Sequence, residues 1–140
     1  MTTEQRKAME TVCDFLKKAN TFYIASIDGD QARVRPFGVI HIFEDKLYIQ
    51  TGRVKDCYKQ FKKNPKVEIS AMYHGRWIRL AGELVEDDRI EAEKSLLDAY
   101  KEMFSDGSYK AGDGNNCVMY FKNAHATINS FTQPQEVYDF

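Results

Sequence analysis

The chain has 140 residues, of which 43% are hydrophobic, and its formal net charge is -1. This length fits one domain, residues 1–140, which can bury a core without disulfide support. The near-neutral charge gives no reason to expect a nucleic acid or an anionic membrane as partner. We find no apolar leader and no run of about 18 apolar residues, so we expect a soluble cytoplasmic protein without a membrane span.

The cysteines and histidines give no sign of a metal site. Cys13, Cys57 and Cys117 are an odd number without CxxC or Cys/His metal spacing, which is typical of reduced thiols that serve packing. The three histidines form neither an HxH nor an HExxH pattern. Hydrolase and nucleotide-triphosphatase motifs such as GxSxG or a Walker loop are also missing, so those reactions are not expected.

The first predicted elements are a helix and a hairpin. Residues 2–19 have apolar side chains at helical spacing, and Thr2 followed three residues later by glutamine is the pattern of a capping box. This helix should cover one side of a sheet. Residues 21–27 are rich in β-branched and aromatic side chains and predict a strand, which the Asp28-Gly29 pair ends in a tight turn.

The second strand carries a pair of arginines. Arg33 and Arg35 are two residues apart, so they point to one face of the strand together with Phe37 and could bind one anionic ligand. Pro36 has no N–H to donate and therefore predicts an edge position or a bulge. Gly38 allows the bend that would curl the sheet toward a barrel.

A phosphate site is predicted where the next strand, residues 46–51, meets a short cationic helix. Backbone N–H groups near residues 52–55 should be unpaired within the helix, and the helix dipole favours negative charge there. Arg53 and Lys55 would add side-chain charge, and Asn64-Pro65 would end the helix. Together with the two strand arginines, this corner favours a ligand that carries a phosphate.

The second half of the chain predicts more short strands around one helix. Asp87-Asp88 should cap that helix, whose buried face would comprise the apolar residues Ile90, Leu97, Tyr100 and Phe104. Short antiparallel strands with tight turns predict a small β-barrel with flanking helices. The expected segments are the strand 67–73, the turn His74-Gly75, the strand 77–85, the loop 105–116 and two last strands over 117–121 and 125–131.

Trp77 and Arg79 are a second candidate pair, because they share one face of the strand 77–85. A tryptophan in a strand most often belongs to the core. The neighbouring Gly75 and Gly82 would nevertheless let a ligand approach closely, and an indole is suited to lie against a flat ring.

Four segments carry a resemblance to a known family: FYIASIDGDQARVRPFGV, DKLYIQTGRVKDCYKQFKKNPKVEI, RWIRLAGELVEDD and ATINSF. They resemble the pyridoxamine 5'-phosphate oxidase-related FMN-binding split barrels, and most of all the small clostridial-type members often grouped with nitroimidazole-resistance proteins. The resemblance implies a mainly β protein with a six-stranded antiparallel split barrel. It also implies a homodimer with FMN at the subunit interface, in two sites built from both subunits.

The resemblance also implies the residues that bind FMN, with Trp77 close to the flavin from the partner subunit and Arg79 on the same strand face. Two features of the oxidases that make pyridoxal phosphate are missing. The helix corner reads Arg53-Val54-Lys55 in place of a basic doublet, and the tail TQPQEVYDF has neither tryptophan nor arginine to hold the substrate phosphate. The remaining cofactor-binding candidates are Arg33, Arg35, Pro36, Gln50, Thr51, Gly52, Arg53 and Lys55.

The expected function is an FMN-dependent, nitroreductase-like oxidoreductase, different from a true pyridoxamine phosphate oxidase. It would pass electrons from a reduced nicotinamide nucleotide to a small planar acceptor, with no side chain as catalytic acid or base. Two alternatives stay open. One is a non-catalytic FMN-binding or redox-sensing protein, and the other is a haem-binding split barrel with His125 or His41 as axial ligand.

Overall fold

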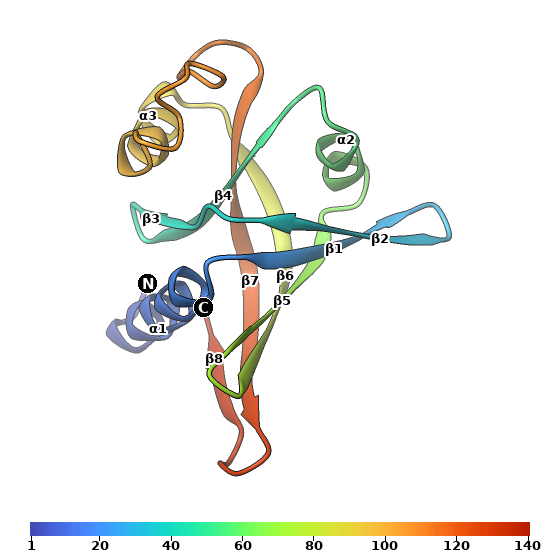
Figure 1. Cartoon of the computed structure of the whole chain (residues 1–140), viewed down its shortest axis with the longest axis vertical. Coiled ribbons are helices and arrows are strands. Elements are labelled where there is room, and N and C mark those ends of the chain that lie inside the picture. The colour runs from blue at the N-terminus through green and yellow to red at the C-terminus, as the bar shows by residue number, and fades with distance from the viewer.

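One antiparallel sheet and three helices make up the computed structural model, which describes all residues from 1 to 140 (Figure 1). The strand order is β2-β1-β5-β6-β7-β4-β3, and β8 also pairs with β7. The end strands β2 and β3 are not hydrogen-bonded to each other, so the barrel is split. The elements are α1 (Thr3–Ala19), β1 (Phe22–Asp28), β2 (Gln31–Phe37), β3 (His41–Phe43), β4 (Lys46–Gly52), α2 (Asp56–Lys63), β5 (Lys66–Tyr73), β6 (Arg76–Asp87), α3 (Ile90–Ala99), β7 (Asn116–Ser130) and β8 (Glu136–Asp139).

Local sequence signals set the N-terminal elements as predicted. Thr2 Oγ1 accepts a hydrogen bond from Gln5 N at 3.0 Å, and Gln5 Oε1 accepts one from Thr2 N at 2.9 Å, which confirms the capping box. Helix α1 packs against β5 and β8 and buries the apolar stripe that the spacing predicted. Gly29, at φ +64°, provides the β1–β2 turn, and Pro36 lies in an edge strand because β2 pairs only with β1.

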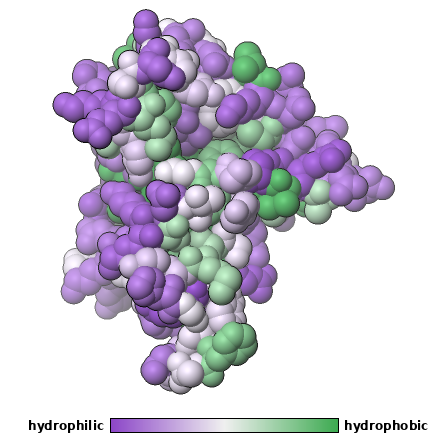
Figure 2. All heavy atoms as spheres, in the orientation of Figure 1, coloured by the Kyte–Doolittle hydropathy of each residue, from purple (hydrophilic) through white to green (hydrophobic).

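The core lies mainly between α1, α2 and the inner face of the sheet, with Phe22, Phe61 and Ile69 among its buried members. A smaller apolar cluster lies between α3, β4 and β7 and includes Tyr48 and Leu96. Figure 2 shows hydrophobic atoms at the surface in the middle of the view and at the lower tip. None of the helices is long and apolar enough to cross a membrane.

The strand count differs from the prediction, since the sheet has eight strands rather than six. The two last strands that the sequence predicted are one continuous strand, β7. Asn123, at φ 54°, lies within it, opposite a register shift between Ala81 and Glu83 in β6. This β-bulge accommodates residues 122–124, which lie between the two predicted strands, without ending β7. The extra strands are β3, which follows the bend after β2, and β8, which the tail adds to the edge of β7.

The prediction that Asp87-Asp88 caps the third helix was wrong. Arg89 is the N-cap residue of α3 and makes no side-chain capping bond, while Asp87 is still part of β6. Ile90 is 56% exposed, so it does not belong to the buried face. The helix ends at Ala99, before Phe104. The buried residues of α3 are Ala92, Glu93, Leu96 and Leu97.

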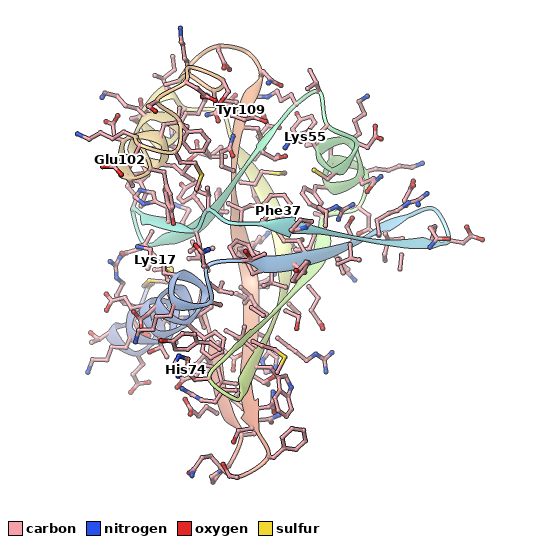
Figure 3. The ribbon with its side chains drawn as sticks, viewed as in Figure 1. Lys17, Phe37, Lys55, His74, Glu102 and Tyr109 are labelled. Atoms are coloured by element: carbon pink, nitrogen blue, oxygen red, sulfur yellow. The ribbon has the colours of Figure 1, made fainter.

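The fold brings the end of β2 close to the start of α2. Figure 3 shows Phe37 of β2 below Lys55, the residue that precedes α2. His74, in the turn between β5 and β6, lies at the other end of the sheet. Predicted site residues near the His74 turn are therefore too far from Phe37 and Lys55 to share a site with them within one chain.

Candidate functional site

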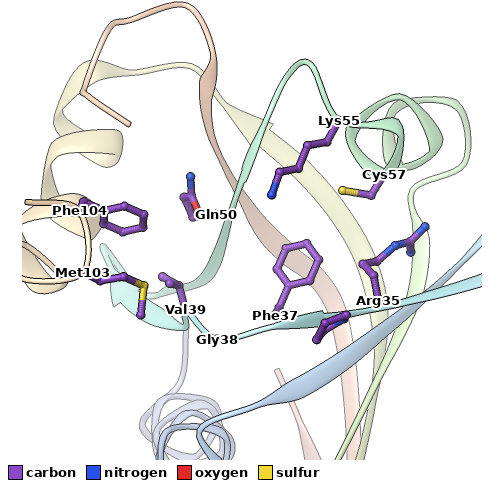
Figure 4. Close-up of a pocket in the computed structure, with 10 residues that line it drawn as sticks. Arg35, Phe37, Gly38, Val39, Gln50, Lys55, Cys57, Met103 and Phe104 are labelled. Carbon is purple, nitrogen blue, oxygen red and sulfur yellow. The ribbon is translucent and has the colours of Figure 1, made fainter. Parts of the chain in front are cut away.

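A cavity of about 390 Å³ opens between β2, β4, α2 and the segment that follows α3 (Figure 4). Its walls therefore come from four parts of the chain that are far apart in sequence. The two cations lie on the α2 side together with Phe37, and the other side is mostly apolar (Figure 4). The lining residues are Arg35, Pro36, Phe37, Gly38, Val39, Gln50, Lys55, Cys57, Met103 and Phe104.

Arg35 is a cation held by neutral groups. Its Nη1 donates to Ser26 Oγ at 2.8 Å and to Ile24 O at 3.2 Å, and its Nη2 donates to Gln60 Oε1 at 2.5 Å. The guanidinium carbon lies 5.3 Å from the ring centroid of Phe61. Burial lowers the pKa of Arg35 from its ordinary value, and no carboxylate pairs with it. The charge at this end of the cavity is therefore available to an anion.

Lys55 is the second cation of the cavity. It is the N-cap residue of α2, forms no ion pair, and extends its side chain into the cavity above Phe37 (Figure 4). The positive end of the α2 dipole lies beside it. Two cations and a helix start thus converge on one side of the cavity.

The expectation of free backbone amides over residues 52–55 was wrong. Arg53 N donates to Asn115 O at 2.8 Å, Val54 N to Asn115 Oδ1 at 3.2 Å, and Lys55 N to Gly52 O at 3.0 Å. The helix begins only at Asp56. The unpaired N–H groups of its first turn therefore lie further along the chain than the sequence suggested.

The apolar side of the cavity is formed by Val39, Met103 and Phe104, with Gln50 beside Phe104, and Phe37 faces it from below Lys55 (Figure 4). Met103 and Phe104 belong to the long connection between α3 and β7. A flat apolar ring could pack on this wall while its anionic group reaches the cations.

All three cysteines are free and buried, as the sequence predicted. Cys13 and Cys117 belong to the core, where burial raises the pKa of both thiols, to about 12 for Cys117. Cys57 is also part of the cavity wall, with its Sγ 3.4 Å from Thr51 Oγ1.

The structure brings four of the predicted site residues together, namely Arg35, Pro36, Gln50 and Lys55. Three others support this corner from behind. Thr51 is 2% exposed, and a Cβ on Gly52 would lie 2.9 Å from Tyr109 Oη. Arg53 pairs with Glu86, with 2.8 Å between Nη2 and Oε2.

Arg33, Trp77 and Arg79 do not line the cavity of their own chain. Arg33 Nε donates to Asp28 Oδ2 at 3.1 Å in the exposed β1–β2 hairpin. Trp77 packs on Phe131, with ring centroids 5.2 Å apart, near the turn marked by His74 in Figure 3. Their roles remain predictions.

The sequence missed six lining residues. Phe37 shares a strand face with Arg35, so alternation along β2 could have assigned it to the same site. Met103 and Phe104 carry no such signal, because they lie in a connection without periodicity. The missed residues are Phe37, Gly38, Val39, Cys57, Met103 and Phe104.

The histidines considered as axial ligands lie elsewhere. His41 Nε2 is 2.8 Å from Ser95 Oγ, and burial lowers the pKa of His41. His125 Nδ1 contacts Asp139 Oδ1 at 2.5 Å on the surface. Neither side chain lines the cavity.

The outer face of the sheet, which extends from the cavity rim toward the His74 turn, carries exposed apolar side chains. Tyr23 and Met72 are 49% and 69% exposed. Register places Pro36, Tyr23, Ser70 and Arg79 in one row across β2, β1, β5 and β6. The row links the rim of the cavity to the strand that holds Trp77, and no helix covers it.

Comparisons with known proteins agree with this architecture. A family model described as pyridoxamine 5'-phosphate oxidase matches residues 8–127. A NimC/NimA family protein from Clostridium acetobutylicum, whose crystal structure is known, is 40% identical to this chain in sequence. The match covers 98% of this chain and 95% of that chain, and the two structures superpose with a TM-score of 0.93. A search among curated proteins gives no match.

Two more distant structures share the fold alone. A protein related to general stress protein 26, also from Clostridium acetobutylicum, is 9% identical over 96% of each chain, with a TM-score of 0.70. A pyridoxamine 5'-phosphate oxidase-related, FMN-binding protein from Nostoc punctiforme is 14% identical, with 100% of this chain and 99% of that chain covered and a TM-score of 0.65.

Proposed function

Because this chain belongs to the pyridoxamine 5'-phosphate oxidase family, we propose that its cavity binds FMN and that the protein is an FMN-dependent oxidoreductase. The observation that carries the proposal is the division of the cavity into two sides. Arg35 and Lys55 lie on one side without carboxylate partners, with Phe37 between them, and Val39, Met103 and Phe104 lie on the other side. A phosphate joined to a flat ring has the matching distribution of charge.

Each wall has a separate task in this proposal. Arg35 and Lys55 hold the phosphate, and the N–H groups of the first turn of α2 add to their charge. Phe37, Val39 and Phe104 pack on the ring and exclude water. When bound, FMN supplies the redox chemistry, taking hydride from a reduced nicotinamide nucleotide and passing electrons to a small planar acceptor such as a nitroaromatic. The side chains orient these reactants, and none has to transfer a proton.

We further propose that a second copy of the chain covers the outer face of the sheet. Exposed Tyr23 lies opposite Pro36 at the cavity rim, and exposed Met72 lies opposite Trp77, so an isologous interface over this face would bury both and bring the partner close to the cavity. Trp77 and Arg79, which are remote from the cavity of their own chain, would then reach the one in the partner subunit. This gives the two predicted residues a role that a single chain does not.

The phosphate assignment is tested by titrating FMN into apoprotein and following the quenching of flavin fluorescence. Arg35→Met and Lys55→Met should each weaken FMN binding by about tenfold or more, because each removes a charged hydrogen-bond donor. Lys94→Met, which removes an exposed lysine paired with Asp98, is the matched control and should not change the affinity. An unchanged affinity in the Arg35/Lys55 double variant would disprove the assignment.

The catalytic part is tested by rapid mixing of the FMN-loaded protein with NADH or NADPH. Loss of flavin absorbance within each turnover, followed by reoxidation when a nitroaromatic is added, supports the oxidoreductase. Flavin that only dithionite reduces would instead identify a binding or sensing protein. A Soret band in the purified protein would favour the haem alternative.

A further inference from the structure

Gln50 is the polar side chain on the apolar side of the cavity, and hydrogen bonds fix the direction of its amide. Its Nε2 donates to Asn116 Oδ1 at 2.9 Å and to Thr51 O at 3.2 Å. The Thr51 carbonyl is a backbone acceptor and can never donate. Rotating the Gln50 amide by half a turn would place two oxygens against each other at both contacts, so the nitrogen must face away from the cavity.

Asn116, which accepts the hydrogen bond from Gln50, is itself held in one orientation by Glu93. Gly112 N, which can only donate, lies 3.2 Å from Glu93 Oε1, so this oxygen acts as an acceptor. Asn116 Nδ2 donates to the same oxygen at 3.2 Å, and this turns Asn116 Oδ1 toward Gln50. Glu93 and Asn116 are 3% and 0% exposed, so water does not compete for these bonds.

The remaining polar atom, Gln50 Oε1, faces the cavity. Gln50 is 8% exposed and lines the cavity, and every buried side-chain nitrogen and oxygen of the chain has a hydrogen-bond partner. Because Oε1 accepts no bond within the chain, it must reach the open space of the cavity. The apolar wall therefore contains one hydrogen-bond acceptor, and its orientation is set in advance.

We propose that Gln50 Oε1 is the specificity-determining acceptor of this cavity and receives the ring N–H of the bound ligand. This inference rests on the proposed binding of FMN, whose oxidised ring system carries a single N–H, at N3. Asn116 and Glu93 are positioning residues, which act only by holding the Gln50 amide. A ligand of the same shape with no donor at this point would leave a nearly buried oxygen unpaired.

The test compares the dissociation constants of FMN and 3-methyl-FMN for apoprotein, measured by fluorescence quenching. Wild-type protein should bind 3-methyl-FMN about ten- to a hundredfold more weakly than FMN. Gln50→Leu should weaken FMN binding and bring the ratio of the two constants close to one. Leucine has no acceptor for the N3–H, so FMN loses its advantage over 3-methyl-FMN. Gln5→Leu, in the first turn of α1 and outside the cavity lining, is the control and should keep the wild-type ratio.

The positioning role is tested with two variants of Glu93. Glu93→Gln keeps an acceptor oxygen for Gly112 and Asn116 and should retain the ratio, whereas Glu93→Leu removes it and should lower the ratio. Equal ratios in wild type and Gln50→Leu would overturn the proposal, and a wild-type ratio in Glu93→Leu would overturn the part played by Glu93. Wild-type protein that binds neither flavin would instead contradict FMN binding itself.

A measurement on the wild type alone keeps the inference testable if the variants do not fold. In protein loaded with ¹⁵N-labelled FMN, the N3 proton should move downfield and exchange slowly with water, because a carbonyl oxygen accepts it. A rapidly exchanging N3 proton in the bound state would refute the contact.

Discussion

Asp87 shows how a single buried carboxylate at the end of β6 is stabilised. Its oxygens accept hydrogen bonds from Arg89 Nη2 at 2.9 Å and from Tyr48 Oη at 2.8 Å. Burial alone would raise the pKa of Asp87. The hydrogen bonds from Arg89, together with the weaker effect of the Tyr48 bond, outweigh it and lower this pKa to about 2. Burial, and after it the hydrogen bond to the Asp87 carboxylate, raises the pKa of Tyr48, so the phenol stays neutral. This carboxylate therefore stabilises the fold only while it is ionised.

The first prediction concerns the pH dependence of this stabilisation. The pKa of Asp87 is lower in the folded chain than its ordinary value of 3.8, so its contribution is complete above about pH 4 and is lost as the pH falls toward 2. Asp87→Asn should lower the free energy of unfolding by about 2 kcal/mol at pH 7. Urea denaturation at several pH values should show this gap closing below pH ~4.

An exposed carboxylate provides the control for this experiment. Asp98 pairs with Lys94 on the surface of α3, with both side chains more than 60% exposed, so Asp98→Asn should change stability little at any pH. A gap between wild type and Asp87→Asn that stays constant from pH 7 to pH ~3 would show that the ionised carboxylate is not its source.

Among the elements, the longest paired strands, β6 and β7, depend on a glycine at their bulge. A Cβ on Gly82 would lie 3.0 Å from Phe121 Cδ1 and 3.3 Å from Lys122 O. The second of these atoms belongs to the backbone and cannot turn away. The register shift after Ala81 and the positive φ of Asn123 occur at this same place.

We therefore expect Gly82→Ala to lower the free energy of unfolding by about 1–3 kcal/mol, since the new methyl group must displace β7 or the Phe121 ring. Thermal unfolding monitored by circular dichroism measures the change. Gly38→Ala is a matched control, because its Cβ would lie 3.7 Å from the nearest atom, Asn20 O, at ordinary contact distance. Equal melting temperatures for the two variants would contradict the prediction.

The elements that the sequence predicted well are those bounded by local chemistry. Thr2, Asp28-Gly29 and His74-Gly75 each determine a cap or turn through their own backbone or side chain, so no distant contact is needed. The continuity of β7 was missed because its bulge depends on Gly82 in another strand. The fold class followed from the number of short strands and tight turns.

The candidate site, too, was predictable only where local sequence signals mark its residues. Alternation along β2 and the helix-start signal identified Arg35 and Lys55. The sequence could not show that Arg33 pairs with Asp28 or that Arg53 pairs with Glu86, because both pairings depend on how the chain folds back. Met103 and Phe104 reach the cavity for the same reason, through the position of the whole α3 segment.

At the scale of the whole molecule, the exposed face of the sheet leads to a prediction about assembly. Wild-type protein should sediment with about twice the chain mass of 16.2 kDa, and Met72→Glu should sediment as a monomer, because the interface would bury an unpaired carboxylate. FMN binding should weaken in the same variant, since Trp77 and Arg79 of the partner subunit would be lost from the cavity.

Ile90→Glu is the control for this experiment. Ile90 is also apolar and more than half exposed, at 56%, but it lies on α3, away from the outer face of the sheet. This variant should remain a dimer. Wild-type protein that sediments at the mass of one chain at micromolar concentration would show that the face is not an interface between copies.

The pairing of β4 has a consequence for when the cavity can form in the cell. Strand β4 is bonded only to β3 and β7, and Gln50 lies opposite Val118. A nascent chain that ends before β7 therefore leaves β4 without its inner neighbour, and the wall between Gln50 and Phe104 has no fixed position. A ligand that depends on this wall is therefore captured only after β7 has emerged and paired with β4.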